Sequence, residues 1–100
     1  MNVVYSTEAR VDLVGIGAWI AQDNPRRAAS FVDELRDACE SLGDMPYAFP
    51  VLELYKLTDI RKRPYRRYII FYRVQGERVE ILHVIHSARN HEAILFGGED

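Results

Sequence analysis

One dipeptide, Asn24-Pro25, separates two helical patterns and so limits the folds that are open to this chain. Asparagine is a favoured helix N-cap, and proline suits the first helical position because its missing N–H would have no partner there. On either side of the dipeptide, apolar residues recur at steps of three and four, as on one face of a helix. Because only a few residues join the two helices, they must form an antiparallel hairpin.

The helix that follows Asn24-Pro25 has the clearest pattern in the chain. One of its faces is apolar throughout, at the 3.6-residue spacing of an amphipathic helix. The members of this face are Ala28, Phe31, Val32, Leu35, Ala38, Cys39 and Leu42. Gly43 stands where a glycine commonly ends a helix as its C-cap.

The preceding helix is expected to begin with Ser6 or Thr7 as its N-cap. Its apolar stripe consists of Ala9, Leu13, Ile16 and Ile20, and Trp19 widens it. Gly15 and Gly17 each weaken a helix by up to about 1 kcal/mol relative to alanine. The presence of both glycines inside a helix would be explained if they allowed the second helix to approach closely.

Apolar runs rich in β-branched and aromatic residues predict strands in the rest of the chain. The expected strands are Asn2 to Ser6, Ile60 to Arg63 (stopped by Pro64), Tyr68 to Val74 and Val79 to His86. Gln75-Gly76-Glu77 predicts a hairpin turn between the last two. Residues 44–57 should form a loop, and Ser87 to Leu95 either a short helix or a further extended piece. The order β-α-α-β-β-β predicts an α+β fold, with a helix hairpin on one face of an antiparallel sheet, in a single domain over residues 1–100.

Charge is divided unevenly along the chain. Residues 1–59 hold five basic and ten acidic side chains, whereas residues 60–100 hold eight basic and five acidic ones. Seven of the thirteen Lys and Arg residues fall between Arg61 and Arg78, interleaved with Tyr65, Tyr68 and Tyr72. Such a run can bind nucleic acid through phosphates and stacking, meet an acidic protein surface, or be a solvated strand face. Composition leaves these three interpretations open.

The sequence favours a cytoplasmic protein. Cys39 is the only cysteine, so no intrachain disulfide can form, and a lone thiol fits a reducing compartment. The N-terminus shows no signal-peptide pattern, and no apolar run approaches the roughly 20 residues that span a bilayer. Neither a metal nor another cofactor is expected, because the three histidines lack ligand spacing and Cys39 lies on a buried helix face.

Three stretches, in this order and in a chain of this length, resemble one known family. The first is Tyr5, Ala9, Asp12, Leu13 and Ile16; the second is Asn24-Pro25 with Ala28, Phe31, Val32 and Leu35. The third and most specific is Arg61 to Pro64 and Arg67 to Val74, followed by Gly76, Val79, Ile81, Val84, Ile85, His86 and Arg89. Over about residues 3–91 the chain thus resembles the RelE/ParE superfamily of type II toxin–antitoxin toxins, closer to the ParE branch.

The resemblance implies one of two targets. RelE-like toxins are ribosome-dependent RNA endonucleases, whereas ParE-like toxins are associated with poisoning of DNA gyrase. The position resembling a common RelE tyrosine holds Leu95, and a strand position where arginine is frequent holds Ile69. We therefore expect gyrase inhibition without catalysis, with ribosome-dependent cleavage of mRNA as the alternative.

The sequence assigns no catalytic residue; the candidates are Arg89, His86 and His91. His83 alternates with Ile81 and Ile85 on one strand, so we expect it to be structural. Target binding is expected of five arginines: Arg61, Arg63, Arg67, Arg73 and Arg89. A third possibility is a non-toxic remnant or scaffold on the same fold.

The resemblance also implies a partner, a ParD- or RelB-like antitoxin encoded in the neighbouring reading frame. Its flexible C-terminal part would fold on the toxin, and its N-terminal part would bind operator DNA as a dimer, giving a heterotetramer or larger complex. Val11, Val14 and Trp19 offer a groove for an amphipathic segment, although Trp19 could instead pack on the sheet. Arg26 and Arg27 could pair with acidic antitoxin residues.

Overall fold

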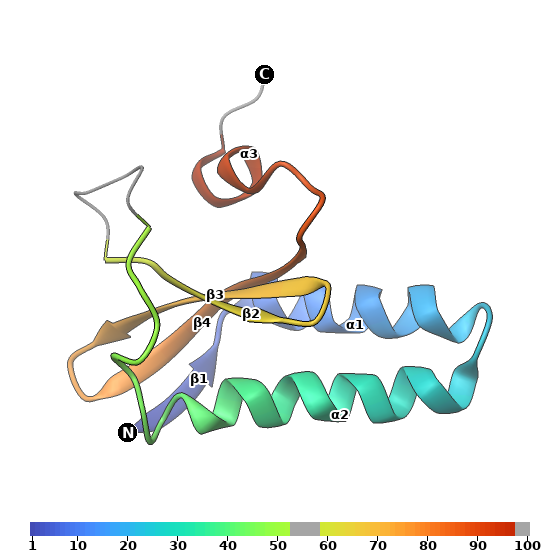
Figure 1. Cartoon of the computed structure of the whole chain (residues 1–100), viewed down its shortest axis with the longest axis horizontal. Helices are drawn as coiled ribbons and strands as arrows, with labels where there is room; N and C mark the ends of the chain where they lie inside the picture. The colour runs from blue at the N-terminus through green and yellow to red at the C-terminus, as the bar shows by residue number, and fades with distance from the viewer. Residues whose placement is uncertain (53–58, 98–100) are drawn as a thin grey trace.

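The computed structural model describes residues 1–52 and 59–97. The elements run β1 (Asn2–Tyr5), α1 (Thr7–Ala21), α2 (Pro25–Ser41), β2 (Arg61–Tyr65), β3 (Tyr68–Gln75), β4 (Arg78–His86) and α3 (His91–Phe96). Helices α1 and α2 lie side by side as a hairpin, and α3 stands on the other side of the sheet (Figure 1). The predicted loop over residues 44–57 lies partly outside the described residues, from residue 53 on.

Helix α2 forms for the reasons that the sequence indicates. The Asn24 side chain accepts a hydrogen bond from the Arg27 N–H at 3.1 Å, and Pro25 is the first helical residue. Gly43, however, is not the left-handed C-cap that we expected, because Leu42 caps the helix in an ordinary helical conformation. A Cβ at Gly43 would lie 2.5 Å from the Met1 carbonyl oxygen, so this glycine permits a close approach of the N-terminus.

Helix α1 begins at the first of its two candidate caps. The Ser6 hydroxyl accepts a hydrogen bond from the Ala9 N–H at 2.9 Å. A Cβ on Gly17 would lie 3.3 Å from Val32 Cγ2, so this glycine brings α1 and α2 together. A Cβ on Gly15 would meet nothing within 4 Å, so close helix packing does not explain this residue.

The sheet has the order β1-β4-β3-β2 and confirms the α+β fold with a helix hairpin on one face. Strands β2, β3 and β4 pair antiparallel. One pairing corrects the expectation of an antiparallel sheet throughout, because β1 runs parallel to β4, with Val3 opposite Val79. Parallel neighbours need a long crossover connection, and here the helix hairpin begins that connection.

Strand β2 also differs from the prediction, since it continues through Pro64 to Tyr65. Pro64 lies on β2, the outermost strand of the sheet, opposite Ile69 of β3. Two residues earlier, the Lys62 N–H points away from β3 and donates to the Pro50 carbonyl at 3.2 Å. The nitrogen of Pro64 shares that orientation, so its missing N–H removes no bond to β3.

Both faces of the sheet are covered by apolar side chains. The main core lies between the sheet and the helix hairpin and includes Leu13, Leu35 and Tyr72. A smaller cluster on the far face is built on Phe71 and Ile85, and Ile94 and Leu95 of α3 pack against it. The residues after β4 therefore take the helical one of their two expected forms. Within the described ranges, no helix is both long and apolar enough to cross a membrane.

Candidate functional site

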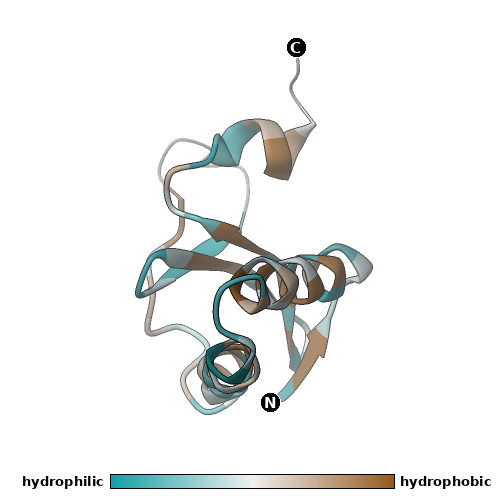
Figure 2. Ribbon diagram, turned by 90° about the vertical axis from the view of Figure 1, so that its right-hand side faces the viewer, coloured by the Kyte–Doolittle hydropathy of each residue, from teal (hydrophilic) through white to brown (hydrophobic). Residues whose placement is uncertain are grey.

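Helix α1 carries apolar residues on its outer side as well as on its core side. Val11, Val14 and Trp19 are 65%, 73% and 69% exposed, respectively. The view along the hairpin shows hydrophobic colour around α1, whereas the end of α2 is largely hydrophilic (Figure 2). Neighbouring apolar side chains on the solvent side of a helix commonly mark a contact surface. The outer side of α1 is therefore the surface whose composition best fits a partner, and Trp19 does not pack on the sheet.

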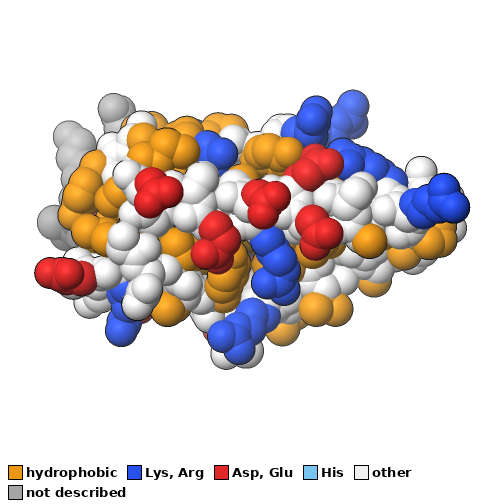
Figure 3. All heavy atoms as spheres, turned by 90° about the horizontal axis from the view of Figure 1, so that it is seen from below, with side chains coloured by type: hydrophobic (Ala, Val, Ile, Leu, Met, Phe, Trp, Pro, Cys, Tyr) orange, Lys and Arg blue, Asp and Glu red, His pale blue; other side chains and the backbone are white. Residues whose placement is uncertain are grey.

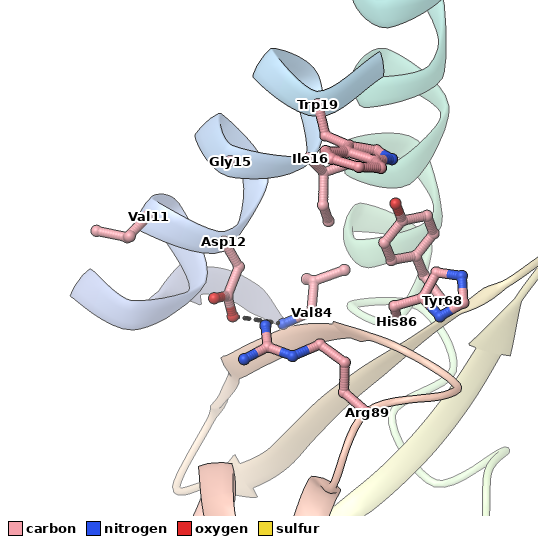
Figure 4. A pocket seen from close by; sticks show the side chains of 9 residues that line it. All are labelled: Val11, Asp12, Gly15, Ile16, Trp19, Tyr68, Val84, His86 and Arg89. Carbon is pink, nitrogen blue, oxygen red and sulfur yellow. Dashed lines mark hydrogen bonds between the residues drawn. The ribbon is translucent and has the colours of Figure 1, made fainter.

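A groove of about 600 Å³ lies between α1 and the end of β4. We call it the α1–β4 groove. It is lined by Val11, Asp12, Gly15, Ile16, Trp19, Tyr68, Val84, His86 and Arg89 (Figure 4). Val11, Gly15 and Trp19 come from successive turns of one helix face, and Arg89 reaches the groove from the segment after β4. Most of this lining is apolar, so the groove suits a side chain of similar character.

Asp12 is bound into the structure rather than free in the groove. Its Oδ2 accepts the Val84 N–H at 2.9 Å and lies 2.7 Å from His83 Nδ1. The paired part of β1 ends opposite Ile81, so Val84 has no strand neighbour on that side and Asp12 takes its place. His83 is thereby satisfied in the structural role expected for it.

The histidines proposed as catalytic candidates are separated by the fold. His86 lines the groove, where its Nδ1 accepts the Ala88 N–H at 3.1 Å and its ring meets the Tyr68 ring edge-on at 5.2 Å. The His91 ring lies 5.2 Å from that of Phe71, in the far-face cluster, and its Nε2 is 3.1 Å from the His86 carbonyl oxygen. Arg89 and His86 share the groove, whereas His91 is not part of its lining.

No complete acid–base set for RNA cleavage lines the groove. Ile69 and Leu95 both pack in the apolar cluster on the far face. Tyr68 is the one phenol of the lining, and burial raises its pKa. Of the other lining side chains, His86 and Asp12 are of types that serve in general acid–base catalysis, and Asp12 Oδ2 is already engaged by the Val84 N–H and His83.

Two of the five candidate target-binding arginines support a neighbouring segment. Arg61 Nη1 donates to the Phe49 carbonyl at 2.6 Å, and its guanidinium lies 5.1 Å from the centre of the Tyr47 ring. The Arg63 guanidinium lies 4.8 Å from the centre of the Phe49 ring. These contacts hold the segment before β2 against the edge of the sheet.

A third arginine, Arg73, is paired across the β3–β4 ladder with Glu80 at 2.8 Å. Glu80 also contacts Arg78 at 3.0 Å. The hydrogen bond from Arg73, followed by that from Arg78, lowers the pKa of the Glu80 carboxyl. Two arginines of the basic run, Arg73 and Arg78, are thus paired with Glu80 within the sheet.

Arg67 and Arg89 are the two candidate arginines that the fold brings together. The Ser87 N–H donates to the Arg67 carbonyl at 2.8 Å, which joins the β2–β3 turn to the segment that carries Arg89. Both side chains are exposed, and neither forms an ion pair within residues 1–52 and 59–97. Arg66 precedes Arg67 in the β2–β3 turn, with a left-handed φ of 54°, and its Nε lies 3.9 Å from Glu34 Oε1. The turn that carries Arg67 therefore adjoins the segment that carries Arg89, which lines the groove.

The candidate antitoxin contacts divide between two places. Val11 and Trp19 line the α1–β4 groove, whereas Val14 borders a shallower hollow between α1 and α2. Arg27 is held by Glu34, with Nη1 2.6 Å from Oε2, and its neighbour Arg26 is exposed.

Sequence reasoning missed five residues of this site: Asp12, Gly15, Ile16, Tyr68 and Val84. Gly15 could have been found, because Val11, Gly15 and Trp19 follow one another at intervals of four on a single helix face. Asp12 and Ile16 belong to the same helix, whereas Tyr68 and Val84 join the groove only through long-range packing. Among the described residues, no group of three His, Cys, Asp or Glu side chains gathers in a way that could hold a metal ion.

Comparison with known proteins gives consistent results. The family model for the ParE toxin of the type II toxin–antitoxin system parDE matches residues 3–91. The solved structure of the chromosomal ParDE system from P. aeruginosa is similar with a TM-score of 0.75 at 17% identity, covering 86% of this chain and 95% of that one. The toxin–antitoxin complex RelBE2 from Mycobacterium tuberculosis is similar with a TM-score of 0.60 at 26% identity, covering 88% of this chain and 92% of that one. None of the curated proteins matches.

Proposed function

Because the chain belongs to the ParE toxin family of type II toxin–antitoxin systems, we propose that it inhibits DNA gyrase by binding and that a ParD-like antitoxin neutralises it. The observation that carries the first half is the chemistry of the α1–β4 groove. It joins an apolar floor to Arg89 and His86, and the carboxylate of its lining, Asp12, is engaged by the Val84 N–H and His83. Such a site fits recognition of a protein surface better than cleavage of a phosphodiester.

The target surface consists of Arg67 and Arg89 in this proposal, with Arg66 beside them. Arg67 and Arg89 are exposed and form no ion pair within residues 1–52 and 59–97, whereas Arg61, Arg63 and Arg73 have contacts within the fold. Arg66 is exposed too, but its Nε lies 3.9 Å from Glu34 Oε1. Arginine is favoured at the centres of protein interfaces because its planar guanidinium binds carboxylates in pairs of hydrogen bonds. We assign Arg61, Arg63 and Arg73 a supporting role, in which they shape the sheet that carries the other two.

The antitoxin is proposed to cover the outer side of α1. Three large apolar side chains there are more than half exposed, and an amphipathic segment would remove them from water. The complex would be a heterotetramer or larger, would contact operator DNA only through the antitoxin, and would act in the cytoplasm without a cofactor.

The alternative is a RelE-like, ribosome-dependent endonuclease. Two observations favour it: the similarity to the RelBE2 complex at 26% identity, and the shared position of Arg89 and His86 in one groove. Arg89 would stabilise the charged phosphate, and His86 would transfer a proton.

Two assays run in parallel separate the proposals. DNA supercoiling by purified gyrase is measured with and without the protein, beside cell-free translation of a defined mRNA. Inhibited supercoiling with intact mRNA supports the gyrase proposal, and the double variant R67E/R89E should restore supercoiling. Cleaved mRNA with normal supercoiling would overturn it and favour the endonuclease. A chain that affects neither reaction would be a non-toxic remnant.

A further inference from the structure

The end of strand β4 has no strand beside it on the side of α1. Strand β4 continues to His86, but β1 pairs with it only as far as Ile81. Backbone groups at the edge of a sheet need other hydrogen-bond partners. The first of these come from the residue that caps α1: the Ser6 N–H and hydroxyl donate to the carbonyls of Ile81 and Leu82, at 2.9 and 2.8 Å.

Asp12 supplies the next partner along this edge. Its Oδ2 accepts the Val84 N–H at 2.9 Å (Figure 4). The same oxygen lies 2.7 Å from His83 Nδ1. The side chains of Asp12 and His83 are 21% and 17% exposed, so little water competes for these contacts. Because a hydrogen bond to a carboxylate is stronger than one between neutral groups, Asp12 holds the backbone firmly at Val84.

An irregularity in β4 accompanies the contact with His83. The register of β3 against β4 shifts by one residue, which makes Leu82 the extra residue of β4. Ile81 belongs to the main core and Ile85 to the far-face cluster, although in a regular strand these two would share a face. Such a bulge redirects the side chains beside it. His83 lies within this irregular part, where its ring reaches the carboxylate of Asp12.

The backbone beyond Val84 leads directly to Arg89. A tight turn follows β4, in which the Arg89 N–H donates to the His86 carbonyl at 3.0 Å and the Ala88 N–H donates to His86 Nδ1 at 3.1 Å. The direction of this turn depends on how the end of the strand is held. We propose that Asp12 is a positioning residue, which holds Val84 and thereby fixes the place of Arg89 in the α1–β4 groove. This inference rests on the proposed function and deepens it, because Arg89 is one of the proposed target-binding residues.

A double-mutant cycle separates positioning from other roles of Asp12. D12A removes the acceptor of the Val84 N–H, R89A removes the guanidinium, and D12A/R89A combines the two changes. Inhibition of gyrase supercoiling is measured for these variants and the wild type, at a temperature at which all four are folded. If Asp12 acts through Arg89, each single variant should weaken inhibition about tenfold, and the double variant should be no weaker than R89A. A loss caused by instability, or by direct contact of Asp12 with the target, would instead add to the loss in R89A.

Two further variants refine the test. D12N keeps a side-chain oxygen that can accept the Val84 N–H, so it should inhibit within about threefold of the wild type. E8A is the matched control, because it removes an exposed carboxylate one turn earlier on the same helix, and it should inhibit like the wild type.

Amide hydrogen exchange gives a second readout that does not involve gyrase. The N–H groups of Val84 and Arg89 should exchange faster in D12A than in the wild type, D12N or E8A. Amides in the pairing of β2 with β3 should exchange at similar rates in all four proteins, because Asp12 does not contact these strands in the proposed role. A general loss of stability would instead accelerate exchange throughout the sheet.

Three results would overturn the positioning role. These are a folded D12A that inhibits gyrase as well as the wild type, losses that add in the double variant, and a D12N as weak as D12A. Failure of the proposed function is recognised separately, because the wild type and E8A would then both leave supercoiling unaffected. In that case the same cycle is measured by mRNA cleavage, and a chain with neither activity would overturn the positioning role as well.

Discussion

Helices α1 and α2 are neighbours of similar length, but they expose different kinds of side chain on their outer sides. Helix α2 buries Phe31, Leu35 and Cys39 and exposes charged side chains. The space-filling view of its outer face shows acidic groups along it, with Lys and Arg side chains around them (Figure 3). Helix α1 buries Leu13 and Ile16 but exposes valines and a tryptophan.

The difference shows which part of the hairpin is complete in the isolated chain. Water solvates the charged face of α2, so this helix needs no further partner. The outer side of α1 leaves apolar side chains exposed to water. Full burial of one Val-sized side chain against a partner would stabilise the complex by about 1.5–3 kcal/mol. We infer that α2 serves the fold, whereas α1 serves both the fold and a partner.

The largest effect should come from the buried side of α2. Leu35 is completely buried, so L35A should lower the free energy of unfolding by about 2–5 kcal/mol. V14A removes apolar atoms from an exposed position on α1 and should change the free energy of unfolding by less than about 0.5 kcal/mol. Urea denaturation of both variants measures the contrast, and a V14A as unstable as L35A would show that the outer side of α1 is part of the core.

The next effect concerns the partner rather than the fold. W19A should weaken antitoxin binding by about 2 kcal/mol, roughly 30-fold, because a central tryptophan is a typical interface hot spot. Its stability should stay within about 0.5 kcal/mol of the wild type. Y47A, which removes another exposed aromatic ring distant in sequence from α1, is the control and should leave antitoxin affinity unchanged. Calorimetric titration measures the antitoxin affinity of W19A and Y47A. Equal losses of affinity in the two variants would argue against a specific role for Trp19.

The two glycines of α1 should respond differently to replacement by alanine. G15A should stabilise the protein by about 0.5–1 kcal/mol, because alanine favours the helix and its Cβ meets no atom. G17A should gain less or be destabilised, since its Cβ would lie 3.3 Å from Val32 Cγ2. Melting temperatures that rise equally in both variants would contradict the close approach at Gly17.

The smallest effect belongs to the charged face of α2. The hydrogen bond from Arg27, followed by that from the Tyr65 hydroxyl, lowers the pKa of the Glu34 carboxyl below its usual 4.5. A lowered pKa in the folded state contributes stability above pH 4.5, and this contribution is lost as the pH falls through the lowered value. E34Q should therefore lose less stability than the wild type between pH 6 and pH 3. Urea midpoints across this range test it, and parallel pH profiles would refute the contribution.

Local patterns predicted the elements of this fold better than their pairing. The Asn24 cap and the apolar stripe of α2 depend on residues within one helix, and both are confirmed. The direction of β1 is not contained in its own four residues, because it depends on how β4 returns beside it. Gly43 and Pro64 were misjudged for the same reason: the N-terminus and the edge of the sheet, not the neighbouring residues, determine what they do.

The candidate site shows the same limit. Its helical half follows from the spacing of Val11, Gly15 and Trp19, which the sequence contains. Its other half comes from β3, β4 and the segment after β4, and only the folded sheet brings Tyr68 and Arg89 to the same helix. The run of basic residues gave no sign of which arginines would be engaged, because Glu80 and the Phe49 carbonyl are supplied by other segments.

We expect the outer side of α1 to become covered in the toxin–antitoxin complex. Trp19 is the only tryptophan of the chain, so its fluorescence reports on this surface alone. Acrylamide quenching would be measured for the free toxin and for its complex with an antitoxin whose own tryptophans, where present, are replaced by phenylalanine. We predict efficient quenching of the free toxin and strong protection in the complex. Equal quenching in both states, at saturating antitoxin, would contradict the account.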